Sequence, residues 1–267
     1  MSSSHMHVLS NSNVAHKASA NSATAGLRLN KAIAQSGLCS RRKADALILA
    51  GRVRVNNQVE TNPARHVHLP TDVLSLDGHT LDASQHPVYV LFHKPVHVVC
   101  TLSDPEGRST ILNVLPEQYK TTRLYPVGRL DYFSEGLLLL TNDGQLAQRL
   151  MHPRYHQPKT YEVLVRGSVH VSSLKTMRHG MCLAEGDRLA PVQVSAIALP
   201  SGDTVLRMVL HQGLNRQIRR MCRDLGLTIL RLRRVAQGVL HLGDLPCGAA
   251  RPLTDTELNA LRKSVQL

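Results

Sequence analysis

The sequence of 267 residues contains no tryptophan, only two phenylalanines and no long apolar segment. No apolar run reaches the roughly 18 residues that would span a bilayer, which excludes a membrane-spanning helix. The N-terminus lacks the charged-then-apolar pattern of a secretory signal, and we find no repeat and no glycine-rich phosphate loop. We therefore expect a cytoplasmic protein.

Cysteine and histidine form no recognisable metal motif. The five cysteines are odd in number and no two lie within ten residues, which excludes a Cys-x-x-Cys unit and favours reduced, mostly buried thiols. His93 and His97, like His152 and His156, are four residues apart, but neither pair has a clear third ligand nearby in the sequence. We expect neither a metal nor a cofactor.

Charge is what the sequence has in excess. It contains 32 Lys and Arg against 19 Asp and Glu, a formal net charge of +13. A protein this basic usually binds a polyanion, with nucleic acid the first candidate and an anionic membrane surface the second. Because the aromatic content is low, stacking against a base must rely largely on tyrosine, histidine or arginine.

Composition divides the chain into four segments. Residues 1–26 are rich in Ser, Asn, Ala and His and predict a disordered leader. Residues 27–76 predict a small basic domain, residues 77–87 a linker, and residues 88–267 a larger domain. In the larger domain short strands and helices do not alternate regularly, which favours an α+β fold with a mainly antiparallel sheet over a parallel one.

The small domain is predicted to start with two helices and a hairpin. The first helix contains Leu29 and ends at Gly37, and the second covers 41–50, with Ser40 as its N-cap. Strands around residues 53–55 and 59 would flank an Asn-Asn turn. Residues 28–65 contain eight Lys or Arg against two acidic residues, which indicates an electrostatic footprint for a polyanion.

Residues 128–144 read Gly-Arg-Leu-Asp-Tyr-Phe-Ser-Glu-Gly-Leu-Leu-Leu-Leu-Thr-Asn-Asp-Gly. The second half is typical of a buried strand and a turn. The first half places Arg129 and Asp131 between glycines, immediately before that strand. Charged side chains on a loop held by a rigid element are typical of a functional site.

Residues 211–226 predict a helix with two stripes. Asn215 is expected to cap it and Gly226 to end it, and the apolar residues from Ile218 to Leu225 fall on one face. Four arginines form the second stripe, with Asp224 as the one acid among them in sequence. Like charges so close together are costly, so we predict that this stripe contacts phosphates.

Together these segments resemble the bacterial ribosomal RNA pseudouridine synthases of the RsuA/RluB branch. The resemblance rests on the 128–144 motif, the Lys159-x-Tyr161 segment and the Arg-Gln-Ile-Arg-Arg-Met run at 216–221. Residues 27–76 resemble the S-four RNA-binding domain that precedes the catalytic domain in that branch. Phe92-His93-Lys94-Pro95 matches the element that opens the catalytic domain.

The resemblance implies that Asp131 is the catalytic aspartate, that Tyr161 stacks on the target base, and that Arg219 pairs with the aspartate. Arg129 would support the site or contact RNA. The remaining predicted RNA-binding residues are Arg28, Lys31, Arg41, Arg42, Lys43, Arg52, Lys94, Arg216, Arg220 and Arg223.

The implied reaction breaks the glycosidic bond of a uridine, turns the base and rejoins it through carbon 5. It needs an ionised carboxylate, which adjacent Arg favours, and it needs no second substrate. The aspartate either adds to the uracil ring or acts at the anomeric carbon, and the sequence leaves both routes open. We expect a monomer that acts on ribosomal RNA or an assembly intermediate.

Residues 149–153 and the leucine run favour large-subunit over small-subunit RNA as the target. Two other classes of function remain as alternatives. One is a non-catalytic RNA-binding or ribosome-assembly factor on the same scaffold. The other is a DNA-binding regulator, since the helices at 28–50 resemble a helix-turn-helix, although no dimerisation segment accompanies them.

Overall fold

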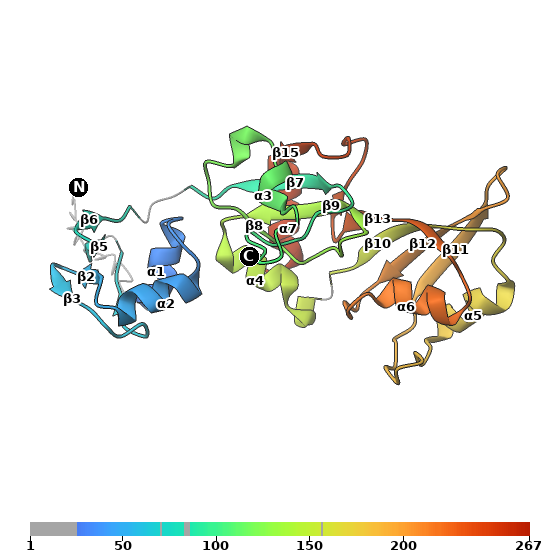
Figure 1. Cartoon of the computed structure of the whole chain (residues 1–267), viewed down its shortest axis with the longest axis horizontal. Coiled ribbons are helices and arrows are strands. Elements are labelled where there is room, and N and C mark those ends of the chain that lie inside the picture. The colour runs from blue at the N-terminus through green and yellow to red at the C-terminus, as the bar shows by residue number, and fades with distance from the viewer. Residues whose placement is uncertain (1–25, 70, 83–85, 156) are drawn as a thin grey trace, which may run out of the picture. The chain divides into compact units, whose positions relative to one another are not determined.

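The computed structural model describes residues 26–69, 71–82, 86–155 and 157–267 (Figure 1). The predicted leader falls outside the described residues except for Gly26. The described residues form two compact units, one built mainly from residues up to Leu81 and one built mainly from residues after it. Throughout the described ranges, every helix is too short or too polar to cross a membrane.

The small unit contains two helices followed by short antiparallel strands. Four strands form a sheet in the order β3-β2-β5-β6, and β1 pairs with β4. The elements are β1 (Leu27–Arg28), α1 (Leu29–Gln35), α2 (Arg41–Leu49), β2 (Val53–Val55), β3 (Gln58–Val59), β4 (His66–Val67), β5 (Leu74–Leu76) and β6 (His79–Thr80).

The pattern of the small unit is the one that the sequence predicts. The apolar residues of both helices are buried, and Gly37 and Gly51 follow the helix ends with positive φ angles. Asn56 and Asn57 also have positive φ, 52° and 66°, as a two-residue hairpin turn requires. The sheet extends beyond the predicted boundary at residue 76, because β6 pairs with β5.

The large unit is a mixed sheet flanked by helices, as predicted. Its strands follow the order β11-β12-β10-β13-β9-β7-β15, with β14 beside β13 and β8 beside β9. Among the described strands β9 and β13 form the one parallel pair, and the others are antiparallel. The elements are β7 (Tyr89–Lys94), α3 (Ile111–Val114), β8 (Tyr125–Pro126), β9 (Glu135–Thr141), α4 (Gly144–Met151), β10 (Lys159–Val165), α5 (Val171–His179), β11 (Gln193–Ala198), β12 (Thr204–Leu210), α6 (Gln217–Asp224), β13 (Ile229–Gln237), β14 (Leu240–His241), β15 (Ala250–Pro252) and α7 (Asp255–Ser264).

Two helix layers cover different parts of this sheet (Figure 1). Helices α5 and α6 pack against β10, β11, β12 and β13 in one apolar core. Helices α4 and α7 pack against one face of β7 and β9, and α3 packs against the other. The leucines of β9 alternate between these two cores, so both faces of the strand are buried, which explains why it reads as an unbroken apolar run.

Gly136 lies where β9 meets β13. Its Cα is the register partner of Arg234, and its φ is +111°. A Cβ added at Gly136 would lie 2.3 Å from the carbonyl oxygen of Arg234, closer than two such atoms can approach. The glycine is therefore needed for the contact that joins the two halves of the sheet and fixes the loop before β9.

Replacing Gly136 with alanine should destabilise the protein by roughly 2–4 kcal/mol, because the new methyl group meets backbone and φ is unfavourable. Gly202→Ala is the matched control, since Gly202 also has a positive φ but nothing lies within 4 Å of its added Cβ. Urea unfolding of both variants measures the difference. Equal losses of stability would show that the close approach at Gly136 contributes nothing.

Candidate active site

The loop between β8 and β9 holds Asp131. The backbone N–H of Ser134 donates to the Asp131 carbonyl over 3.2 Å, which closes a tight turn. Beneath this turn, the ammonium group of Lys94 donates to the carbonyls of Ser134 and Pro95 over 2.8 and 2.7 Å. Lys94 is fully buried, so these bonds fix the loop against β7.

The Asp131 carboxylate accepts four hydrogen bonds. Arg219 donates from Nε to Oδ2 over 2.8 Å and from Nη2 to Oδ1 over 3.2 Å, in a bidentate pair. Oδ1 also accepts from the Ser134 hydroxyl over 2.7 Å and from the Phe133 backbone N–H over 3.0 Å. Nη2 of Arg219 donates to the Ser134 hydroxyl oxygen over 3.0 Å as well, so the three side chains form one network.

This network sets the charge of Asp131. Partial burial is the largest single effect and acts to raise the pKa of the carboxyl group. The hydrogen bonds from Arg219 and Ser134, with the positive charges of Arg219 and Arg216, outweigh it and hold the pKa below its usual value. The carboxylate is therefore ionised at neutral pH. Because the side chain is 21% exposed, the carboxylate is also accessible to a ligand.

Helix α6 carries Arg219 to the carboxylate. Its apolar side, Ile218, Met221 and Cys222, is buried against the sheet, and Arg219 projects from the adjacent side. The predicted cap at Asn215 is wrong. The N-cap is Arg216, which has a left-handed φ of 48°, and no side-chain cap bond is made there. The Gln217 side chain instead accepts from the Leu214 N–H at 3.4 Å.

The three residues with predicted catalytic roles line a single cleft. It has a volume of about 670 Å³ and is bounded by the Asp131 loop, β10, β13 and the start of α6. Tyr161 lies half-buried on β10, between Met208 of β12 and Arg234 of β13 in register. Arg129 and Arg216 also line the cleft and are exposed, and their side chains have no hydrogen bond or ion pair to another described residue.

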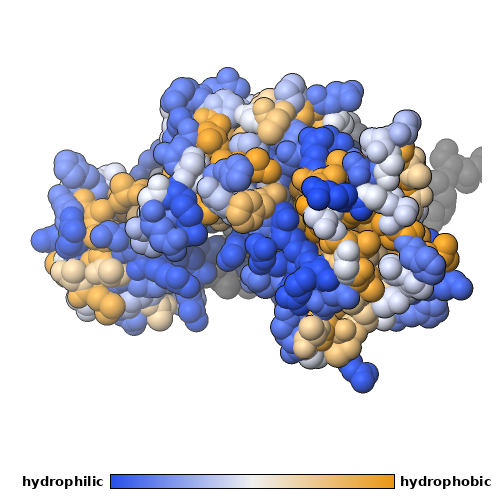
Figure 2. All heavy atoms as spheres, turned by 45° about the vertical axis from the view of Figure 1, so that its right-hand side comes forward, coloured by the Kyte–Doolittle hydropathy of each residue, from blue (hydrophilic) through white to orange (hydrophobic). Residues whose placement is uncertain are grey.

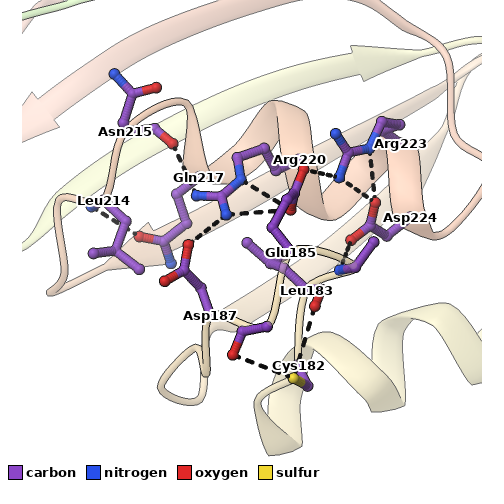
Figure 3. Close-up of polar contacts among 12 residues, drawn as sticks. Cys182, Leu183, Glu185, Asp187, Leu214, Asn215, Gln217, Arg220, Arg223 and Asp224 are labelled. Atoms are coloured by element: carbon purple, nitrogen blue, oxygen red, sulfur yellow. Dashed lines mark hydrogen bonds and ion pairs between the residues drawn. The ribbon is translucent and has the colours of Figure 1, made fainter.

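The sequence analysis inferred phosphate contacts from the repulsion among the arginines of the α6 stripe, and the structure corrects this reason. Arg220 and Arg223 pair with acidic groups, two of which, Glu185 and Asp187, are distant in sequence (Figure 3). Arg220 pairs with Glu185 at 3.2 Å and with Asp187, and Arg223 pairs with Glu185 at 2.6 Å and with Asp224 at 2.7 Å. These contacts attach the loop between α5 and β11 to the helix. Arg216 is thus the arginine of the stripe that is left for an anion.

Two other predicted RNA contacts also have different roles in the structure. The prediction for Lys94 is wrong, because its ammonium group is buried beneath the Asp131 loop. Arg52 is exposed but forms a two-bond ion pair with Asp77, with Nε donating to Oδ1 over 2.9 Å. The side chains of Arg28, Lys31 and Arg42 in the small unit have no polar partner among the described residues, and the Arg41 side chain donates only to Asn30, over 3.3 Å.

Several residues of the site escaped the sequence analysis. Arg234 is 1% exposed, lines the cleft and donates from Nε to the Leu137 carbonyl, while its Nη2 has no partner. His97, Tyr132 and Phe133 form a cluster of edge-to-face rings with centroids 5.1–5.6 Å apart. Phe133 is half exposed, and a second, smaller cleft of about 340 Å³ lies between Phe133 and Arg219. The position of Tyr132 and Phe133 directly after Asp131 in the motif was a signal for two of these rings, and no sequence pattern indicated His97.

The comparisons with known proteins identify the family. A family model described as RNA pseudouridylate synthase matches residues 88–224, and an S4 domain model matches residues 27–74. The chain belongs to the RNA pseudouridylate synthase family. It is an RNA pseudouridine synthase, an intramolecular isomerase that acts on RNA, with an N-terminal S4 domain.

Individual relatives extend along almost the whole chain. A protein of Aquifex aeolicus named uncharacterized RNA pseudouridine synthase is 38% identical over 90% of this chain and 96% of its own length. The ribosomal large subunit pseudouridine synthase B of Bacillus subtilis is 38% identical over 88% of this chain and 95% of its own. A crystal structure of a pseudouridylate synthase has a TM-score of 0.62 at 27% identity, covering 88% of this chain and 99% of that one.

Replacing Arg219 with methionine should move the acid limb of the activity profile to higher pH. Without the guanidinium, burial dominates and the pKa of Asp131 rises, so the carboxylate is protonated, and activity lost, at a higher pH than in the wild type. Single-turnover rates measured across pH test this. Arg219→Lys keeps a positive charge and should shift the limb less. An unchanged limb in Arg219→Met would contradict the assigned role.

Proposed function

We propose that the protein converts a specific uridine of large-subunit ribosomal RNA to pseudouridine, with Asp131 as the catalytic carboxylate. The observation that carries this proposal is the accessible Asp131 carboxylate, held ionised by Arg219 and Ser134 at the wall of the cleft. An ionised carboxylate serves both possible routes, addition to the uracil ring and attack at the anomeric carbon. No other substrate is needed, because the base stays in the site and is reattached.

Tyr161 and Arg219 take supporting roles in this proposal. A uridine inside a helix is out of reach, so the nucleotide must be flipped out, at a cost of a few kcal/mol. Tyr161 on the cleft wall offers a flat face to the flipped base. Arg219 keeps Asp131 charged and oriented, and its second bond to Ser134 limits the freedom of the pair.

Cations on both units would bind the RNA backbone. In the small unit Arg28, Arg41 and Arg42 are exposed, and in the large unit Arg129 and Arg216 flank the cleft without an ion pair to a described residue. On the face drawn in Figure 2, hydrophilic surface is extensive and the apolar areas are broken up by it. Such a surface suits a charged, hydrated partner such as RNA better than a large apolar protein interface.

Relatives support the large subunit as the source of the target. Proteins of Bacillus subtilis and Pseudomonas aeruginosa, both 38% identical to this chain, are named ribosomal large subunit pseudouridine synthase B. The second relative matches over 91% of this chain and 63% of its own length.

A pseudouridine-specific chemical readout on unmodified large- and small-subunit ribosomal RNA tests the proposal. The wild-type protein should create one new site in the large-subunit RNA. Asp131→Asn keeps the shape and removes the charge, so it should create none while binding RNA with similar affinity.

Each of the other outcomes would contradict a different part of the proposal. A site in small-subunit RNA would overturn the choice of target and leave the chemistry in place. Near-normal turnover by Asp131→Asn would show that another group is the catalytic carboxylate. Tight binding without any product from the wild type, on free RNA and on assembly particles, would favour a non-catalytic binding factor.

Removing Arg41 and Arg42 together should weaken RNA binding and reduce its dependence on salt. The slope of log K against log salt should fall by about 1 for each phosphate contact that is lost. The double variant Lys175→Ala/Lys263→Ala is the matched control, since both lysines are exposed and lie on α5 and α7. Equal effects of the two double variants would show that net charge, rather than the S4 domain's surface, sets the affinity.

A further inference from the structure

His93 has a buried ring nitrogen without a hydrogen-bond partner in the described part of the chain. The residue lies near the end of β7, which is between β9 and β15 in the sheet, and it is 3% exposed. Its Nδ1 is 2.8 Å from the Leu245 carbonyl oxygen, so Nδ1 carries the proton and donates it. Nε2 then holds a free lone pair, and it has no partner among the described residues. A buried acceptor left without a partner is costly, which points to a missing ligand.

Two further residues with possible ligand atoms lie beside His93. A ring nitrogen of His93, the Sγ atom of Cys247 and a carboxylate oxygen of Glu135 all lie within 4.8 Å of one another. Glu135 is on β9, which pairs with β7, and Cys247 is on the segment before β15, where the Gly248 N–H donates to the His93 carbonyl over 2.9 Å. Adjacent backbone segments thus supply one donor each, and sequence spacing gives no sign of the group.

We propose that His93, Glu135 and Cys247 bind a divalent zinc-type cation. Imidazole nitrogen, thiolate sulfur and a carboxylate oxygen are all ligands that zinc accepts. Ligands around tetrahedral zinc are about 3.4–3.7 Å apart for bonds of about 2.0–2.3 Å, so small side-chain rotations close the site. On binding, the Cys247 thiol loses its proton to solvent, and a water takes the fourth position.

The surroundings of the group fit this role. The bond from His93 to the Leu245 carbonyl fixes the ring and its tautomer, as carbonyls commonly do for zinc-bound histidines. Arg231 pairs with Oε1 of Glu135, and Oε2 has no hydrogen-bond partner in the ranges that the structure describes. The Arg231 side chain is 52% exposed, so water screens its charge from the cation. Cys247 is exposed, contrary to the expectation of mostly buried thiols, and gives the ion a path from solvent.

A cation here would join β7, β9 and the segment before β15. Glu135 follows Asp131 by four residues, at the point where the catalytic loop enters β9. The ion would therefore brace the strand that positions the loop, without touching the cleft: none of its three ligands lines the cleft. Its role is structural, and its loss should lower stability before it changes the chemical step.

Cobalt(II) titration of the full-length protein tests the site, because a cobalt–thiolate bond gives a charge-transfer band in the near ultraviolet. One equivalent of cobalt should produce this band, with visible bands typical of tetrahedral coordination, and zinc should displace it. Cys247→Ser should abolish the charge-transfer band. Cys182→Ser is the matched control, since Cys182 is also an exposed free cysteine but lies outside the group, and it should keep the band.

Thermal unfolding with and without zinc gives a second readout. Zinc should raise the Tm of the wild type and of Cys182→Ser but not of Cys247→Ser, and Glu135→Gln should weaken zinc binding at least tenfold. A band that survives in Cys247→Ser would overturn the assignment. So would cobalt binding without a sulfur band, which would come from other histidines of the chain. Neither result depends on RNA or on turnover.

Discussion

The ion pair between Asp131 and Arg219 joins two parts of the chain that are 88 residues apart. A carboxylate in a partly closed cleft tends to take up a proton, because burial penalises its charged form. Two bonds from a guanidinium and one from Ser134 reverse that tendency. The chemistry proposed for the cleft needs a charged carboxylate. The loop before β9 and helix α6 must therefore keep the relative position in which Arg219 reaches Asp131.

Contacts in much of the large unit maintain this relative position of the loop and the helix. Lys94 fixes the Asp131 turn from below, and Gly136 allows β9 to lie against β13, whose Arg234 donates to the Leu137 carbonyl. On the other side, α6 is held by its buried apolar side and by the acids that pair with Arg220 and Arg223 (Figure 3). Arg220 and Arg223 thus stabilise the position of the helix through ion pairs. Arg129 and Arg216 are left as the exposed cations at the cleft.

The sequence predicted the elements and the family but not the pairings between distant residues. The leucines of β9, the stripe on α6 and the Asn-Asn turn are local patterns, and each predicted its element within about two residues. The partners of Arg220, the burial of Lys94 and the left-handed Arg216 depend on which segments meet in the fold. A family motif could place Asp131 beside Arg219, whereas nothing in the spacing of Glu185 and Asp187 places them beside α6. The group of His93, Glu135 and Cys247 was missed for the same reason.

The charge of Asp131 is the claim on which the account depends, and it can be measured on the protein without RNA. Carbon-13 NMR of aspartate-labelled wild-type protein, with the Asp131 carboxyl signal assigned by its absence in Asp131→Asn, gives the titration directly. The account predicts a pKa below the usual value of about 3.9 for an aspartate. A midpoint at or above that value would mean that burial outweighs Arg219 and Ser134, and that the carboxylate is not held ionised as proposed.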